Sequence, residues 1–423
     1  MNPSTNTAFA DANPHALGMI MDSAEQCEIV ASEDIYDEHD VKLWSSGQPV
    51  TRQLQQRLLE RKLKRPLESC LRAQDGVSLI DILDDVDAFF ATGCPLAEAL
   101  RPQAVAVAHE IPQLQLHPVA QLLLTAARSS QTAAYPHAIR GMVLAGAIAH
   151  ADGPADPYFL RLAMLGGLLH DIGEMYVNPQ YLQASQKLTV EEYRHVVAHP
   201  RIGQSLLASQ TDYPEALTRA ISEHHERLDG SGYPGQKTRD AISPLGQLLG
   251  VVETTLGIAA SAETPLARTS FAMRVIPGEY PLKWIGLIAS AAHRADEDLG
   301  GNPHDSQDGQ DADTLHALDT CLAACLALAG ALGTTSRSEP VRRIAAKALH
   351  LLERLRAGWN TMGMWSAAQG VLPADQRFER RMAQRELRWR MSYVQRECLW
   401  PVRGLEAADA AELQPLWDAL SAN

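Results

Sequence analysis

Apolar residues recur at three- and four-residue spacing over most of the chain, which predicts a mainly α-helical protein. Clear examples are SLIDILDDVDAFF (78–90), HPVAQLLLTAAR (117–128) and LAMLGGLLHDIGE (162–174). The exception is 28–50, where short extended runs surround a polar turn and predict a small β-hairpin. A charged helix over 51–68 is expected to follow it.

Changes in this pattern divide the chain into six expected regions. They are a flexible leader (1–25), a module of a β-hairpin and a helix (26–75), connecting helices (76–130), a helical bundle with polar residues inside its apolar helices (131–295), an acidic linker (296–314) and a C-terminal helical region (315–423). The linker is rich in Asp, Gly and Asn, but its aspartates do not have the spacing of a calcium-binding loop. The last long helix alternates arginine with glutamate, which favours a salt-bridged solvent face over a nucleotide-binding or membrane surface.

Composition narrows the classes of partner and compartment. A chain of 423 residues predicts two or three domains, and its net charge of −14 argues against duplex nucleic acid as a partner. The longest apolar run, Cys321–Gly333, is shorter than the roughly 20 residues of a membrane span. The N-terminus lacks the basic start of a signal peptide, so we expect a cytoplasmic protein without a membrane segment.

The 6 cysteines show no C-x-x-C pair, which argues against disulfides and structural zinc. Cys321 and Cys325 are one helical turn apart and could hold a metal, but two small core residues on one helix face are favoured.

Histidines and an aspartate interrupt the apolar helices between 131 and 293. Burying His170 and Asp171 is costly unless they pair or bind a metal. Each histidine alone is better explained as a hydrogen-bonded core residue. Taken together, the set predicts a metal centre with nitrogen and oxygen ligands, suited to iron, manganese or zinc. Its members are His137, His170, Asp171, His199, His224 and His225.

The adjacent histidines in HHERLDGSGYP (224–234) fit this centre. Consecutive helical residues point about 100° apart, so both can face one metal only near a helix end. The preceding run EALTRAISE predicts a helix that ends just before a glycine turn. The sequence therefore places His224 and His225 at that helix end.

HDIGE, the His199–Pro200 pair and HHERLDGSGYP together resemble the HD-GYP subfamily of the HD phosphohydrolase superfamily. Its members are all-helical bacterial enzymes that hydrolyse cyclic di-GMP and often carry an unrelated N-terminal module. The resemblance covers about 131–260. It implies an HD-type helical bundle, with 131–295 as a metal-dependent phosphohydrolase domain, between a small β-hairpin module and a C-terminal helical region.

The resemblance also implies roles for single residues. One divalent metal ion would take His137, His170, Asp171 and Glu253, and a second would take Asp171, His199, His224 and His225, with iron or manganese expected and zinc as the alternative. His170 and Asp171 form the catalytic pair, and a hydroxide shared by the metals attacks phosphorus. Gly232, Tyr233 and Pro234 would contact the substrate or, alternatively, form a rigid turn; Glu226 and Asp229 would orient ligand histidines.

Three positions depart from the family pattern. Glu253 replaces an aspartate, Glu174 replaces a lysine that holds the scissile phosphate, and Ala133 replaces a glutamate found in members with three metals. After Glu253, no basic residue follows until Arg268, where the family has an element that contacts the dinucleotide. We expect two metals, and the replaced lysine keeps alternatives to catalysis open.

The resulting hypothesis is a cyclic di-GMP phosphodiesterase of bacterial second-messenger signalling. Its alternatives are a catalytically impaired signalling or interaction module and a hydrolase of another phosphoester. The expected partners are cyclic di-GMP or a related phosphoester, with a second copy of the chain or signalling proteins as further candidates.

Overall fold

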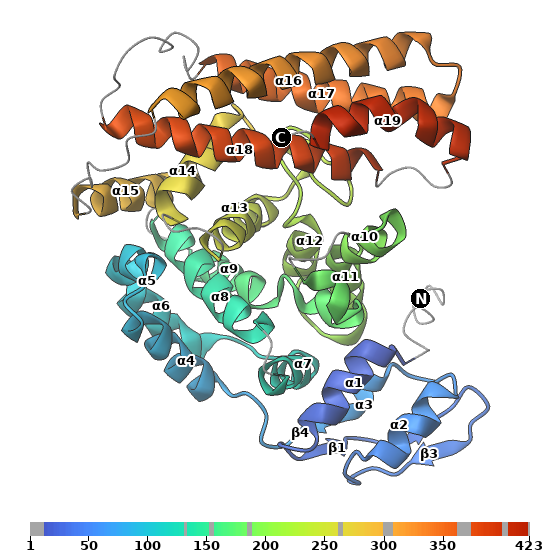
Figure 1. The fold of residues 1–423 in the computed structure, drawn as a ribbon. Helices are drawn as coiled ribbons and strands as arrows, with labels where there is room; N and C mark the ends of the chain where they lie inside the picture. The colour runs from blue at the N-terminus through green and yellow to red at the C-terminus, as the bar shows by residue number, and fades with distance from the viewer. Residues whose placement is uncertain are drawn as a thin grey trace. The chain divides into compact units, whose positions relative to one another are not determined.

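The computed structural model describes residues 12–130, 133–151, 156–183, 188–260, 265–298, 308–361, 374–399 and 405–421, and it is mainly helical (Figure 1). The chain forms two compact units. The first unit contains Met1–Ser261 and Pro281–Leu287, and the second contains Ala262–Tyr280 and Ile288–Asn423. The bundle predicted over 131–295 therefore divides near residue 261, and most of its last part packs in the second unit.

Part of the predicted flexible leader is a helix, α1 (Pro14–Ser23). The Asn13 side chain caps it by accepting hydrogen bonds from the backbone of His15 and Ala16. Leu17 and Ile20 are buried on its inner face. The prediction of a flexible leader is therefore wrong for Pro14–Ser23, where the few apolar residues lie among small residues and give only a weak helical periodicity. Residues 1–11 lie outside the described part.

The N-terminal strands pair partly as predicted. β2 (Ile35–Tyr36) and β3 (Lys42–Trp44) form the expected antiparallel pair. β1 (Ile29–Ala31) instead pairs with β4 (Leu71–Ala73), a partner far along the chain that local patterning cannot indicate.

The helix expected over 51–68 is divided into α2 (Arg52–Leu59) and α3 (Leu67–Cys70). Pro66 directly precedes α3, and between the two helices Leu63 forms an isolated bridge to Asp37. A proline disfavours helical conformation in the residue before it, which accounts for the break.

Helices account for the rest of the first unit. They are α4 (Leu79–Ala91), α5 (Pro95–Leu100), α6 (Ala104–Glu110), α7 (Pro118–Ser129), α8 (Ala134–Ala151), α9 (Pro157–Leu169), α10 (Val190–Val196), α11 (His199–Gln210), α12 (Glu215–Glu223) and α13 (Pro244–Ala259). Short 3₁₀ turns, η1 (Arg101–Gln103), η2 (Ile111–Gln113), η3 (Ile172–Tyr176), η4 (Pro179–Leu182) and η5 (Arg239–Ala241), connect them. The helices predicted at 78–90 and 117–128 are confirmed as α4 and α7.

Helices α8 and α9 cross at two glycines in backbone contact. A Cβ on Gly167 would lie 2.2 Å from the carbonyl oxygen of Gly141, and a Cβ on Gly141 would lie 2.4 Å from that of Gly167. His137 is one turn before this crossing on α8, and His170 follows it by about one turn at the end of α9. The close approach brings these two histidines together.

The second unit contains α14 (Pro265–Val275), the end of α15 (Leu282–Asp298), α16 (Asp308–Thr335), α17 (Glu339–Thr361), α18 (Ala374–Leu399) and α19 (Ala407–Ser421). Both ends of the acidic linker predicted at 296–314 are helical, since α15 ends at Asp298 and α16 begins at Asp308. Residues 299–307 lie outside the described part.

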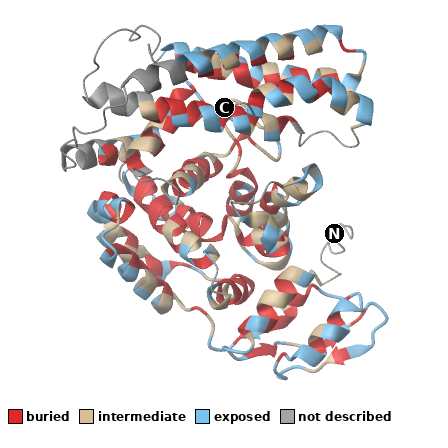
Figure 2. Cartoon of the chain, viewed as in Figure 1, coloured by how far each residue is buried: buried red, intermediate tan, exposed pale blue. Residues whose placement is uncertain are grey.

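Helix α16 contains the apolar run singled out in the sequence. By length and composition, His316–Thr335 is the one helix among the described residues that could cross a membrane. Its residues Leu318, Leu322 and Cys325 are buried in the core that α16 forms with α17, α18 and α19 (Figure 2). The Cys321 thiol donates to the carbonyl of Ala419 at 3.1 Å, which agrees with packing rather than metal binding by this cysteine pair.

Helix α18 differs from the solvent-facing, salt-bridged helix that its charges predict. Glu386 and Glu397 are 2% and 0% exposed. Glu386 binds the buried Arg390 at 2.7 Å, and Arg390 also pairs with Glu279. Lys347 of α17 lies 3.4 Å from Glu397. These glutamates therefore neutralise cations inside the unit, where an unpaired charge would be costly.

Because the α8–α9 crossing has no room for a side chain, we expect Gly167→Ala to lower the free energy of unfolding by roughly 1–3 kcal/mol or more. Urea unfolding measures this change. Gly257→Ala in α13 is the matched control, since a Cβ there meets nothing within 4 Å. It should leave stability unchanged or raise it slightly. Equal effects of the two substitutions would contradict a close-packed crossing.

Candidate metal centre

Three histidines near helix ends are oriented in the same way. His170 follows α9, His224 follows α12, and His199 comes shortly after α10. The Nδ1 of each lies close to the carbonyl oxygen three residues earlier, at 2.9 Å for His170, 2.7 Å for His199 and 2.6 Å for His224. A carbonyl can only accept, so each Nδ1 carries a proton and each Nε2 is free to bind a metal.

The first group of converging side chains joins α8, the end of α9 and α13. His137 and His170 direct Nε2 at Asp171 Oδ2, at 3.3 and 3.2 Å. The same two nitrogens lie 3.4 and 3.3 Å from Glu253 Oε2. One ligand atom from each of these four residues lies within 4.8 Å of the others.

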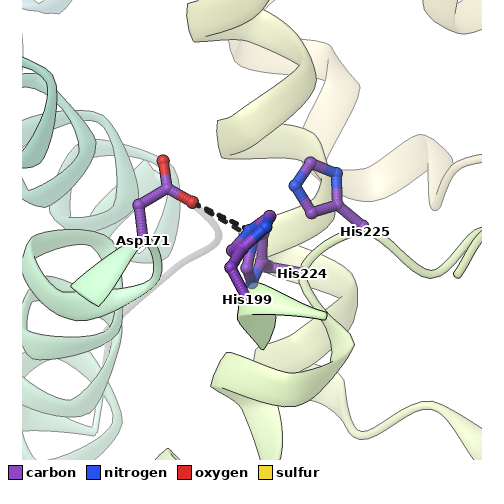
Figure 3. Close-up of side chains that lie close together, drawn as sticks. All are labelled: Asp171, His199, His224 and His225. Atoms are coloured by element: carbon purple, nitrogen blue, oxygen red, sulfur yellow. Dashed lines mark hydrogen bonds and ion pairs between the residues drawn. The ribbon is translucent and has the colours of Figure 1, made fainter. Parts of the chain in front are cut away.

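The second group uses the other oxygen of the same aspartate. His199 and His224 each place Nε2 3.3 Å from Asp171 Oδ1 (Figure 3). His225 completes the group, again with ligand atoms within 4.8 Å of one another. Asp171 Oδ1 is buried and forms no hydrogen bond with either nitrogen, despite the short distances. The atoms therefore converge on a common space rather than on each other.

This geometry fits divalent metal ions. The Nε2 atoms of His137 and His170 are 3.2 Å apart, and those of His199 and His224 are 3.1 Å apart. Two unprotonated nitrogens that face each other at this distance repel, so a proton or a cation must lie between them. Imidazole and carboxylate donors suit zinc, iron and manganese. All seven predicted ligands fall into the two groups, and Asp171 is common to both.

In the metal-free protein, the carboxylates of Asp171 and Glu253 favour protonation of the imidazoles in the first group. Burial opposes protonation of His137, but the hydrogen bonds that its imidazole donates to Asp171 and Glu253 outweigh this effect and raise its pKa to about 9. Burial likewise works against the charge of Asp171, yet the charge of His170 and the neighbouring imidazoles hold the pKa of Asp171 well below its usual value. In the second group, burial lowers the pKa values of His224 and His225, which favours the neutral form that binds metals.

The GYP loop packs on the histidine doublet. The ring of Tyr233 stacks on His225, with centroids 4.4 Å apart and planes at 17°. Its backbone amide donates to the carbonyl of His225 at 3.2 Å. A Cβ on Gly232 would lie 2.3 Å from that carbonyl oxygen, so only glycine fits. The Pro234 carbonyl accepts from Arg201 at 3.1 Å. These contacts support the rigid-turn alternative; substrate contact by the loop stays a prediction.

Glu226 and Asp229, the acidic residues that follow the doublet, accept hydrogen bonds from the turn after it. Glu226, predicted to orient a ligand histidine, accepts hydrogen bonds from the backbone amides of Gly235 and of Lys237, the latter at 2.8 Å. Asp229 accepts from the backbone and hydroxyl of Ser231, at 3.0 and 2.6 Å. Sequence proximity to the histidines does not reveal these partners because the side chain of Glu226 reaches forward along the turn; orientation of a ligand histidine by Glu226 or Asp229 stays a prediction.

Two anchoring residues were not foreseen from the sequence. Arg227 donates to the carbonyl of Glu226 at 2.9 Å and to the hydroxyl of Thr254 at 2.9 Å, beside Glu253. Glu223 is fully buried and accepts from Lys237 at 2.7 Å and from the amide of Ser243 at 2.8 Å. Both join the end of α12 to α13, and the charged residues flanking the doublet were their only signal in the sequence.

Glu174 belongs to the electrostatic surroundings of the metal ligands. It lies on η3 and is half-buried, three residues after Asp171. Burial and then the charge of Asp171 raise its pKa to about 7. The position therefore adds a carboxyl group to the site instead of the lysine of the family pattern.

Comparison with known proteins agrees with the motifs. A family model described as an HD domain matches residues 121–267. A cyclic di-GMP phosphodiesterase of Pseudomonas aeruginosa is 36% identical over 132 residues, which are 31% of this chain and 32% of that protein. The 3'3'-cGAMP-specific phosphodiesterase 3 of Vibrio cholerae serotype O1 is 36% identical over 143 residues, or 33% and 28% of the two chains.

A third relative is the cyclic di-GMP phosphodiesterase response regulator RpfG of Xanthomonas campestris pv. campestris, 30% identical over 131 residues. That match covers 26% of this chain and 35% of RpfG. The chain thus spans about a third of the length of the curated relatives it matches. Residues 121–267, which carry the HDIGE and GYP motifs, thus match the HD domain family, and the chain is similar over part of its length to these phosphodiesterases.

Proposed function

We propose that the chain is a metal-dependent phosphodiesterase that hydrolyses cyclic di-GMP or a closely related cyclic dinucleotide, in the cytoplasm, as part of bacterial second-messenger signalling. The observation that carries the proposal is the sharing of Asp171 between two groups of ligands, one on each carboxylate oxygen. Relatives named for hydrolysis of cyclic di-GMP and 3'3'-cGAMP support the substrate class.

We further propose that each group holds one divalent ion, iron or manganese, with zinc as the alternative. Such ions, when bound, neutralise charge on phosphate oxygens and make water a nucleophile at neutral pH. The protein would fix their separation through Asp171 and their positions through the carbonyl-held imidazoles. Ala133 supplies no ligand atom, so a two-metal site is the arrangement that these residues support.

A second candidate function is a metal-binding signalling module without hydrolysis. Glu174 favours it, because a carboxylate beside the ligands repels the phosphodiester that a lysine would attract. A third candidate, hydrolysis of a different phosphoester, uses the same metal groups.

Activity measurements separate these candidates. We expect the manganese-loaded wild type to hydrolyse cyclic di-GMP, and Asp171→Ala to lose turnover because both metal groups lose their shared ligand. Glu174→Lys should raise kcat/KM by roughly tenfold, since it replaces repulsion of the phosphate by attraction. Glu38→Lys makes the same charge change at an exposed residue of the N-terminal module and should have no effect.

The outcomes have distinct meanings. A metal-loaded wild type without turnover would contradict hydrolysis, and rescue by Glu174→Lys would then support the second candidate. Turnover of 3'3'-cGAMP or another phosphoester in place of cyclic di-GMP would support a different substrate for the same centre.

Metal binding should depend on pH. In the metal-free protein, His137 keeps its proton up to about pH 9, compared with an ordinary pKa of 6.5. The stability it contributes is therefore fully present below pH 6.5 and is lost as the pH rises through about 9. A metal must displace this proton, so Mn²⁺ affinity should rise by up to about tenfold per pH unit across that window.

Isothermal titration calorimetry at several pH values measures the Mn²⁺ affinity. Thermal unfolding in EDTA measures the stability of the metal-free protein, which should fall as the pH rises. His137→Gln removes the titrating group and should flatten both profiles. Mn²⁺ affinity that stays constant between pH 6.5 and 9 in the wild type would count against a ligand role for His137.

A further inference from the structure

The N-terminal module contacts the segment that directly follows the catalytic aspartate. Tyr176 is the last residue of η3, which begins immediately after Asp171. Its hydroxyl donates to Glu68 Oε1 at 2.6 Å, across 108 residues of chain. The two side chains are buried, with 8% of Tyr176 and 5% of Glu68 exposed. The bond therefore joins α3 of the module to the metal-bearing part of the first unit.

A second bond holds the backbone of the same tyrosine. The Asn13 side-chain amide donates to the Tyr176 carbonyl at 3.1 Å. The other end of that side chain caps α1 by accepting from the His15 amide at 2.9 Å. Helix α1 itself packs on η3 and α7. Helix α1, which precedes the module and is counted with it from here on, holds the main chain of Tyr176, and α3 holds its side chain.

On its other side, η3 packs against α11, the helix that begins with His199. Gln210, at the far end of α11, lies near the Glu68 carboxylate. Glu68 is therefore close to both segments that carry ligands, the Asp171–η3 segment and α11. Burying a carboxyl group at this junction costs free energy, and burial raises its pKa. If this contact only held the two segments together, apolar side chains would do so at a lower cost in free energy.

We propose that Glu68 and Tyr176 are positioning residues for the metal centre, through which the N-terminal module fixes the place of Asp171. This inference rests on the metal centre of the proposed function, though not on its substrate. Asp171 belongs to both ligand groups, so a displaced η3 weakens both metals together. By linkage, metal binding must strengthen the contact between the module and η3 by the same factor.

Titration of the metal-free full chain with Mn²⁺ tests the proposal, at a temperature where each variant is folded. Tyr176→Phe removes only the hydroxyl, and Glu68→Leu removes its acceptor; each should weaken both Mn²⁺ binding steps by about 2- to 30-fold. Glu68→Gln keeps an acceptor oxygen for Tyr176 and should bind Mn²⁺ within about twofold of the wild type.

The matched control is Ser23→Ala. Ser23 is fully buried at the end of α1, but its hydroxyl donates to the hydroxyl of Ser129 on α7, at 3.1 Å, rather than to η3. It should lower stability without changing Mn²⁺ affinity. Hydrogen exchange of the wild type gives an independent reading: amides of α1 and α3 should exchange more slowly once Mn²⁺ is bound.

Unchanged Mn²⁺ affinity in Tyr176→Phe and Glu68→Leu would overturn the proposal, as would an equal loss in Ser23→Ala. If Tyr176→Phe does not fold, the difference between Glu68→Leu and Glu68→Gln decides, together with hydrogen exchange of the wild type. A wild type that binds no Mn²⁺ would instead refute the metal centre itself, which distinguishes the two failures.

Discussion

The site depends on one electrostatic constraint: two pairs of imidazole nitrogens face each other at about 3 Å around the half-buried carboxylate of Asp171. Backbone carbonyls fix the Nδ1 protons of His170, His199 and His224, so these rings cannot turn away without breaking a hydrogen bond. The pairs are stable only when a proton or a metal lies between the nitrogens. The helix ends, the α8–α9 crossing and the turn after α12 all serve to bring them to this distance.

The convergence of these seven side chains could be predicted from the sequence because each of them stands out from its local pattern. A histidine or carboxylate that interrupts an apolar helix, or follows its last turn, costs free energy to bury unless it is paired or binds a metal. The anchors around the set could not be predicted in the same way. The partners of Glu226 and Arg227 depend on the path of the turn, and the pairing of β1 with β4 depends on a distant segment. Such contacts are decided by tertiary packing, which local periodicity does not encode.

The second unit shows a related limit. Charges at i and i+4 on a helix indicate that two residues share a face, but not whether that face meets water. Glu386 and Arg390 form such a pair, yet both are buried because Glu279 supplies a second carboxylate to the guanidinium. In α16, by contrast, the apolar residues are continuous enough to resemble a membrane span, while Leu322 and Cys325 are core residues of a helical unit. In both helices the tertiary partner decides the environment.

The GYP turn completes the orientation of the imidazoles. His225 adjoins a carbonyl-held neighbour, but within the described residues no hydrogen bond to its own ring nitrogens is found. The stacked ring of Tyr233 restrains it instead. That stack requires the turn to lie directly on the backbone of the doublet, which Gly232 permits and the bonds of Glu226 and Arg201 maintain. The turn therefore has a physical role that does not depend on a substrate: it determines where the imidazole of His225 points within the second group.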